Sequence, residues 1–224
     1  MKIDILTLFP EMFTPLSASL LGKAREKQLL TINVYDIRKF SQDKHSKCDD
    51  YTFGGGAGML LTPQPIHDCI NFVDSEHKAK RIYMSPKGVT LTQQVVKSLA
   101  EEEHILLLCG HYEGIDQRII DLDIDYELSI GDYVLTGGEL ASMVVVDAVS
   151  RYVDGVLGSS QSVVDESFSN NSLEYPQYTR PQVFCGLSVP PVLISGNHQE
   201  VDKWREEQSQ LMTKRFRPDL LNKD

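Results

Sequence analysis

Five glycine-bearing stretches contain the residues best suited to chemistry: residues 53–59, 84–88, 109–116, 129–140 and 194–198. Glycine permits positive φ angles and lets a backbone approach a ligand closely. Three of these stretches, 84–88, 109–116 and 129–140, follow predicted strands. Because ligands of open parallel sheets lie beyond the carboxyl ends of the strands, we expect these three to converge on one pocket. Each stretch alone is more typical of an ordinary strand-to-helix turn.

The kind of ligand is narrowed by motifs that the sequence lacks. It contains neither G-x-x-x-x-G-K-[ST] nor a G-x-G-x-x-G after the first predicted strand, which argues against a classical NTPase or dehydrogenase. A pocket of backbone amides and carbonyls, with a carboxylate such as Glu113 or Asp116, suits an adenosyl ligand that carries a positive centre. S-adenosylmethionine has this chemistry, although these residues permit it without requiring it.

Three charged residues are further candidates, and each has a plainer interpretation. Arg151 follows Asp147 by four residues on a predicted helix, a spacing that favours a surface ion pair. Asp165 and Glu166 lie in a polar segment and could simply be solvated acids. The alternative is that the arginine and one of the acids act in catalysis.

The elements that must position these residues alternate between strands and helices. Short apolar runs typical of buried parallel strands occupy residues 3–9, 31–37, 81–85 and 105–109. This alternation predicts an α/β fold with a parallel sheet flanked by helices. Helical spacing is shown by two sets of apolar residues: Met12, Leu16, Leu20 and Ala24 in the first helix, and Leu91, Val95 and Leu99 in the second.

The second half of the chain differs from the first in its pattern of apolar and polar residues. From residue 139 the sequence predicts a long, mostly buried helix that Gly155 and Gly158 terminate, and then a polar linker. We therefore expect an α/β domain over residues 1–158, a flexible linker over 159–171, and a small, mainly helical domain over 172–224. An apolar stripe is predicted on the final helix, formed by Val201, Trp204, Leu211 and Met212.

Composition describes a globular protein of 224 residues with 41% hydrophobic residues and a formal net charge of −10. Residues 101–150 alone hold twelve acids and one base, so the acidity is local. The overall charge argues against a protein that coats nucleic acid by bulk charge, but basic residues at 23–47 and in the tail could contact a polyanion. The four cysteines are far apart, without zinc-ligand spacing, which favours a reducing cytoplasm. No segment resembles a signal peptide or membrane anchor.

Seven motifs together resemble one family of enzymes. They are LTLFPEMF (6–13), DDYTFGGGAGMLL (49–61), GHYEGID (110–116), SIGDYVLTGGEL (129–140), YTRP (178–181), VPPVLISGNH (189–198) and Trp204-Arg205. The family is that of the bacterial tRNA (guanine-N1)-methyltransferases, which methylate the guanine at tRNA position 37 and are members of the SPOUT superfamily. The resemblance extends from one end of the chain to the other.

This resemblance implies a deep trefoil knot in the α/β domain, an antiparallel homodimer, and tRNA, rather than DNA or a membrane, as partner. It also implies S-adenosylmethionine as cofactor, with Mg²⁺ as a possible assistant. Residues that match the family's cofactor pocket are Tyr83, Met84, Ser85, Pro86, Gly110, Tyr112, Glu113, Gly114, Ser129, Ile130, Gly131, Tyr133, Leu135, Gly137 and Gly138.

The catalytic roles are carried over residue by residue. Guanine N1 is a poor nucleophile until it loses its proton, which a carboxylate can accept, and a guanidinium can stabilise the charge that develops toward O6. The arginine of the family matches Arg151. The family reads D-S-F where this chain has D-E-S-F at 165–168, so an ungapped match places Glu166 at the base position, with Asp165 as the alternative.

The substrate contacts follow from the first glycine-rich segment. Asp49, Asp50, Gly55 and Gly56 are expected near the target base and its neighbour, because carboxylates accept hydrogen bonds from guanine N1 and N2. The sequence Tyr-Thr-Phe at 51–53 departs from the Arg-Pro-Tyr of the family and removes one arginine.

Two other functions stay open: a SPOUT methyltransferase for a different RNA position, and a binding module whose glycine loops only form turns.

Overall fold

The computed structural model describes residues 1–157, 166–168 and 171–221, and the predicted base alternative Asp165 lies outside these residues. The chain divides into two compact units, residues 1–158 and 159–224, which are described separately. No helix of the described residues combines the length and the apolar character that crossing a membrane requires.

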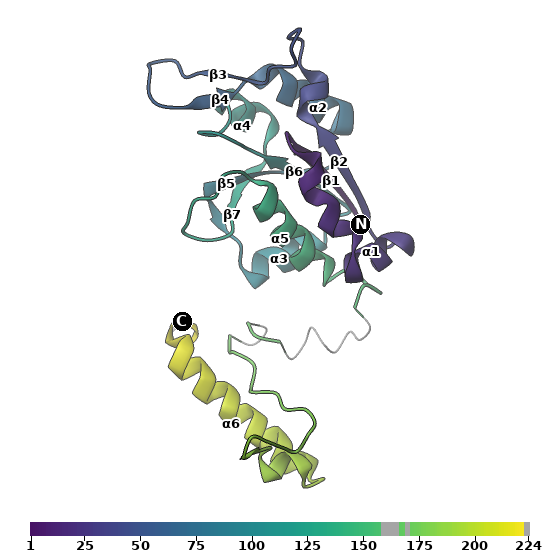
Figure 1. Cartoon of the computed structure of the whole chain (residues 1–224), viewed down its shortest axis with the longest axis vertical. Coiled ribbons are helices and arrows are strands. Elements are labelled where there is room, and N and C mark those ends of the chain that lie inside the picture. Colours follow the sequence, from purple (N-terminus) through teal and green to yellow (C-terminus); the bar gives the residue numbers. More distant parts are fainter. Residues whose placement is uncertain (158–165, 169–170, 222–224) are drawn as a thin grey trace. The chain divides into compact units, whose positions relative to one another are not determined.

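The first unit is built on a five-stranded sheet in the order β2-β1-β6-β5-β7 (Figure 1). Its strands are β1 (Lys2–Thr7), β2 (Thr31–Asp36), β5 (Lys80–Thr90), β6 (His104–Cys109) and β7 (Tyr126–Ser129). All neighbouring strands are parallel, with Ile3 opposite both Ile32 and Ile105. The predicted parallel sheet is confirmed. β5 extends beyond its predicted end because Val89 and Thr90 pair again with β7 after an irregularity that follows Met84.

Helices cover both faces of this sheet, and the strands alternate their side chains between the two (Figure 1). Ile3, Ile5, Ile105 and Leu107 pack on the face covered by α1 (Ser19–Glu26), α3 (Gln93–Ala100) and α5 (Glu139–Ser150). The opposite face receives α2 (Pro63–Asp74) and α4 (Gln117–Asp123). Burial of the strands on both faces explains their continuously apolar sequences.

Two helix predictions need correction. The predicted continuous helix over Met12 to Ala24 is divided into the 3₁₀ helix η1 (Pro10–Ser17) and α1, with Ser19 at a positive φ of 53° between them. α5 ends at Ser150 rather than near Gly158. After it, backbone hydrogen bonds from Tyr152 to Val149 and from Val153 to Ser150 replace the longer-range α-helical pattern.

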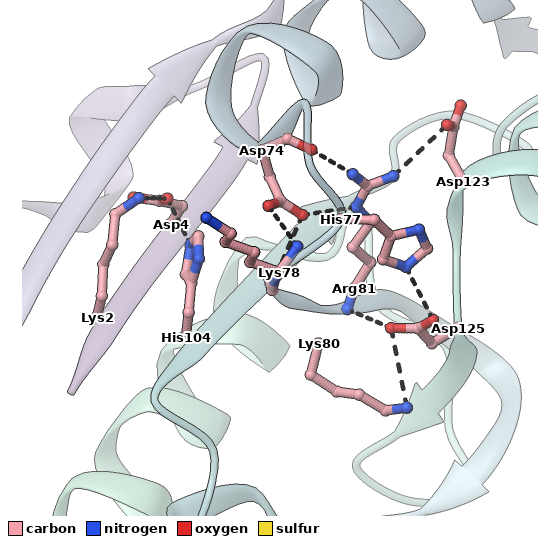
Figure 2. Close-up of polar contacts among 11 residues, drawn as sticks. Lys2, Asp4, Asp74, His77, Lys78, Lys80, Arg81, His104, Asp123 and Asp125 are labelled. Carbon is pink, nitrogen blue, oxygen red and sulfur yellow. Dashed lines mark hydrogen bonds and ion pairs between the residues drawn. The ribbon is translucent and has the colours of Figure 1, made fainter.

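An ion-pair network surrounds the amino ends of the sheet strands (Figure 2). The Arg81 side chain is 4% exposed, its Nε lies 2.8 Å from Asp74 Oδ2, and its Nη1 lies 3.7 Å from Asp123 Oδ1. The Asp4 side chain, fully buried in β1, lies 2.7 Å from Lys2 Nζ and 2.8 Å from His104 Nε2. These charges lie at the amino edge of the sheet, whereas the glycine-rich loops lie at its carboxyl edge.

The second unit contains the hairpin β8 (Val183–Phe184) and β9 (Leu187–Ser188), the 3₁₀ helices η4 (Pro191–Ile194) and η5 (Pro218–Leu220), and α6 (His198–Phe216). The predicted apolar stripe on α6 is partly wrong. Leu211 is 59% exposed, whereas Thr213 is fully buried. The buried Thr213 hydroxyl accepts a hydrogen bond from the Leu173 amide at 2.8 Å.

Candidate functional site

A pocket of about 310 Å³ lies at the carboxyl ends of β5, β6 and β7. The stretches 84–88, 109–116 and 129–140, far apart in the sequence, contribute most of its lining. All fifteen residues predicted to form the cofactor pocket line it: Tyr83, Met84, Ser85, Pro86, Gly110, Tyr112, Glu113, Gly114, Ser129, Ile130, Gly131, Tyr133, Leu135, Gly137 and Gly138. The parallel sheet brings them together because each loop leaves the same edge.

The glycines of the pocket are required by close backbone contacts. A Cβ on Gly138 would lie 2.9 Å from the Cys109 Cα and 3.1 Å from the Gly110 nitrogen, while the Gly138 amide donates to the Gly110 carbonyl at 2.9 Å. A Cβ on Gly110 would lie 2.6 Å from the Tyr83 hydroxyl. Side chains at these positions would force the loops apart, so glycine keeps the pocket narrow and exposes its backbone amides and carbonyls.

Tyr83 supplies a neutral hydroxyl to this pocket. Burial, followed by electrostatic interactions with Glu127 and Cys109, raises the pKa of Tyr83 to about 12. The phenol therefore keeps its proton at neutral pH and can donate a hydrogen bond. Together with the glycine cradle it provides donors and acceptors on a narrow, half-apolar surface, which fits an adenosyl ligand.

A two-stranded hairpin connects the predicted substrate residues to the pocket. Its strands are β3 (Asp49–Tyr51) and β4 (Met59–Leu61), so Asp49 and Asp50 lie on one strand and Gly55 and Gly56 in the connecting turn. The hairpin is hydrogen-bonded to the 110–116 loop: the Glu113 amide donates to the Met59 carbonyl at 3.1 Å, and the Leu61 amide donates to the Gly114 carbonyl at 3.0 Å. The structure therefore places β4 against a pocket loop, whereas the four predicted substrate residues are not among those that line the pocket.

The tip of this hairpin is polar and aromatic. The Asp50 side chain is 68% exposed and lies 3.8 Å from Lys47 Nζ. Tyr51 is 79% exposed and Phe53 is 99% exposed. Exposed aromatic side chains beside carboxylates suit an unstacked base, which needs both stacking and hydrogen bonding.

The predicted catalytic residue Arg151 does not line the pocket of its own chain. It follows the last residue of α5, whose first residue, Glu139, directly follows the pocket residue Gly138. Twelve helical residues at 1.5 Å each separate the two ends by about 18 Å. The length of the helix thus keeps Arg151 away from the pocket of the same chain.

The predicted base Glu166 belongs to the second unit. It lines a cavity of about 700 Å³ together with residues of α6 such as Arg205 and Ser209. The following Ser167 accepts a hydrogen bond from the Glu174 amide at 3.0 Å, and the Phe168 amide donates to the Ser172 carbonyl at 2.8 Å. Local bonds to residues near α6 therefore hold the turn that carries Glu166.

Several residues that line the pocket were not predicted. Lys87, His111, Glu127, Thr136 and Ala141 face it from the same loops and from α5. His111 is notable because its Nδ1 is buried and has no hydrogen-bond partner within the described part of the chain. Their position within the glycine-bearing stretches, or next to them, was the only signal available in the sequence.

No group of three or more His, Cys, Asp or Glu side chains in the described ranges could hold a metal ion. The three pocket-forming loops thus supply hydrogen-bonding and apolar groups, with Lys87, Glu113 and Glu127 as the charged side chains facing the cavity.

Comparisons with known proteins show the family of this chain. The model of the family described as tRNA (guanine-1)-methyltransferase TrmD matches residues 1–223. The tRNA (guanine-N(1)-)-methyltransferase of Alkaliphilus metalliredigens (strain QYMF) is 57% identical over 226 residues, which cover 99% of this chain and 92% of that protein. That of Clostridium botulinum (strain Hall) is 55% identical over 223 residues, covering 100% and 92%. Because the match is end to end, this chain belongs to the tRNA (guanine-N1)-methyltransferase family.

Proposed function

We propose that this protein transfers a methyl group from S-adenosylmethionine to N1 of the guanine at position 37 of tRNA. The observation that carries the proposal is the glycine-lined pocket at the carboxyl edge of the sheet, with the hairpin of Asp49 and Asp50 hydrogen-bonded to its rim. In a chain of this family, the first feature suits the cofactor and the second suits a guanine in an unstacked loop.

The pocket residues would hold the cofactor through backbone and hydroxyl groups. When bound, S-adenosylmethionine supplies an electrophilic methyl group on a positively charged sulfur. Gly110 and Gly138 leave room for it because any side chain there would overlap neighbouring backbone or Tyr83. The Tyr83 hydroxyl, protonated at neutral pH, is a hydrogen-bond donor on the wall of the pocket.

The substrate requires a base and a stabilising cation. Guanine N1 carries a proton at neutral pH, so we assign its removal to the Glu166 carboxylate, with Asp165 as the alternative. Arg151 would stabilise the negative charge that develops on guanine O6. A positioned general base contributes roughly 10² to 10⁴ in rate, so this carboxylate should dominate kcat without affecting cofactor affinity.

The position of Arg151 supports a homodimer. Since α5 holds this residue about 18 Å from the start of the helix, a second copy running antiparallel could bring its own Arg151 to the pocket. The surface of α5 fits such a contact because Leu140 and Val144, one turn apart, are 49% and 46% exposed. Val134, in the pocket loop, is 82% exposed and extends this apolar surface.

Basic residues provide the expected contacts to the tRNA backbone. Residues 23–47 and the tail from Lys203 to Arg217 are rich in lysine and arginine, in a chain that is acidic overall. Phosphate contacts of this kind position the RNA, whereas the hairpin carboxylates would read the base. A trefoil-knotted path through the pocket loops and a cytoplasmic location complete the proposal, on the basis of the family resemblance.

The decisive experiment maps the methylated nucleotide on a tRNA transcript with guanine at positions 36 and 37. Reverse transcription should stop beside position 37 after incubation with the protein and S-adenosylmethionine, because a methyl group on N1 blocks base pairing. A transcript with adenine at 37 is the matched control and should give no such stop. Product at another position would favour a SPOUT enzyme with a different RNA target.

A binding module is distinguished by ligand stabilisation. S-adenosylmethionine should raise the melting temperature in proportion to RT ln(1 + [L]/Kd), which is about 2.7 kcal/mol at a hundredfold excess over Kd. Absence of any stabilisation by this ligand or by S-adenosylhomocysteine, with the protein folded, would refute the cofactor assignment.

A further inference from the structure

A buried carboxylate beneath the pocket has no role in the function proposed above. Glu139, the first residue of α5, is 2% exposed. Its Oε1 accepts a hydrogen bond of 2.8 Å from the Thr7 hydroxyl, and within the described ranges no lysine or arginine forms an ion pair with it. Burying a carboxylate without a cation costs free energy, so its retention calls for a positive partner.

The carboxylate lies against the floor of the pocket. A Cβ placed on Gly137, a lining residue, would overlap Glu139 Oε2 and would lie 2.7 Å from the His111 Cδ2. Glu139 itself does not line the pocket, but this oxygen lies directly beside Gly137, and the neighbouring residues Gly138 and Ala141 also line the pocket. Glu139 is also the first residue of α5, a helix of twelve residues, and the positive end of the helix dipole attracts a negative charge there.

Residues from three chain segments surround the carboxylate, and one of them binds it. Thr7, at the end of β1, accepts a hydrogen bond from the Phe9 amide at 2.9 Å while it donates to Glu139. His111 forms an isolated bridge with Gly137, and its ring lies 4.9 Å from that of Phe9. The hydrogen bond from Thr7 thus ties the carboxylate at the start of α5 to the end of β1.

We propose that Glu139 is a specificity-determining residue that makes the pocket favour a cationic ligand over a neutral one of the same shape. This inference rests on the proposed function, because S-adenosylmethionine carries a positive sulfur and its product, S-adenosylhomocysteine, does not. A fixed negative charge beside Gly137 attracts S-adenosylmethionine and leaves S-adenosylhomocysteine nearly unaffected. Discrimination of this kind weakens retention of the product after each transfer.

Other charged groups facing the pocket are more accessible to water. Glu113 and Lys87 are exposed, and Glu127 is half-buried. Solvent screens them more strongly than it screens Glu139. The buried carboxylate should therefore account for most of the charge preference of the pocket.

The test is isothermal titration of three ligands into the whole protein: S-adenosylmethionine, S-adenosylhomocysteine and sinefungin, in which an amine supplies the positive charge. Glu139→Gln removes the charge and keeps the shape of the side chain. We expect both cationic ligands to lose about tenfold in affinity relative to S-adenosylhomocysteine, which corresponds to about 1.4 kcal/mol.

Thr7→Val is the matched control because it removes the hydrogen bond to the carboxylate and keeps the charge. Its affinities should change by the same factor for all three ligands, so the ratios stay within twofold of the native ones. Equal changes for all ligands in Glu139→Gln, or no change, would overturn the inference and leave Glu139 a structural residue.

Two further outcomes are informative. If Glu139→Gln does not fold, Glu139→Asp replaces it; since that variant keeps the charge, the native ratios should persist, and their loss would refute the electrostatic account. If the native protein binds none of the three ligands, the proposed function itself fails, which is distinct from failure of this inference.

Discussion

The buried ion pair of Arg81 and Asp74 gives the most quantitative prediction for this fold (Figure 2). Asp74→Asn would remove the charge from a carboxylate that accepts hydrogen bonds from Arg81 Nε at 2.8 Å, from the Lys78 amide at 2.8 Å and from the Ala79 amide at 3.2 Å. An asparagine cannot accept all three hydrogen bonds, because its side-chain NH₂ group would face at least one of the three N–H donors.

The magnitude follows from burial. Breaking a buried pair by changing one partner costs about 3 to 5 kcal/mol, since a charge is left uncompensated. We expect the lower end, about 3 kcal/mol, because Asp123 Oδ1 lies 3.7 Å from Arg81 Nη1 and retains part of the compensation. For a unit of this size each kcal/mol shifts the melting temperature by roughly 2 to 4 °C, so a decrease of about 6 to 12 °C is expected.

The pH dependence has a definite sign. Burial alone raises the pKa of Asp74, but the hydrogen bonds from Arg81, Lys78 and Ala79 outweigh it and hold that pKa below its ordinary value of 3.8. A carboxyl with a lowered pKa stabilises the fold above its ordinary pKa, and this contribution is lost as the pH falls through the pKa of the folded state. The stability difference between the native protein and Asp74→Asn should therefore be constant near pH 7 and shrink below about pH 4.

Calorimetry at pH 7 and in acid measures both quantities. Glu76→Gln is the matched control, because Glu76 and its partner Lys78 are 68% and 72% exposed, and such surface pairs contribute about 0 to 1 kcal/mol. A melting temperature of Asp74→Asn within 2 °C of the native one at pH 7 would refute the inference that this buried ion pair stabilises the fold.

The remaining predictions concern the site. Glu166→Gln should lower kcat for tRNA methylation by about 10² to 10⁴ with unchanged affinity for S-adenosylhomocysteine, whereas full activity in this variant and loss in Asp165→Asn would reverse the assignment of the base. Gly138→Ala places a Cβ 2.9 Å from the Cys109 Cα, an overpacking cost of about 1 to 3 kcal/mol that should weaken S-adenosylhomocysteine binding by roughly 5- to 150-fold in titration calorimetry; native affinity would contradict the tight cradle. Asp50→Asn should raise KM for tRNA about tenfold with little effect on cofactor affinity, because a hydrogen bond to a charged group contributes roughly 1.5 to 3 kcal/mol; an unchanged KM would remove Asp50 from the substrate contacts.

The sequence alone predicted the parallel sheet and the meeting of three glycine-bearing stretches at one pocket, and the family resemblance supplied fifteen of the residues that line it. Buried parallel strands have a recognisable continuous apolar pattern, as in residues 105–109, and loops that leave the same edge of a sheet must meet there. The helix lengths were less predictable. The end of α5 at Ser150 depends on the turns that follow it, and α4, with seven residues, is too short to give a clear period.

The tertiary structure alone decided how far the predicted site residues lie from one another and which charges are buried. Gly138 and Arg151 are both predicted site residues close in the sequence, but the rise of α5 separates them by about 18 Å. Glu139 looks like an ordinary helix-start acid until Thr7, 132 positions earlier, meets it beneath the pocket. Local pattern determines elements because it reflects neighbouring residues, whereas burial and charge pairing depend on contacts that exist only after distant segments have packed.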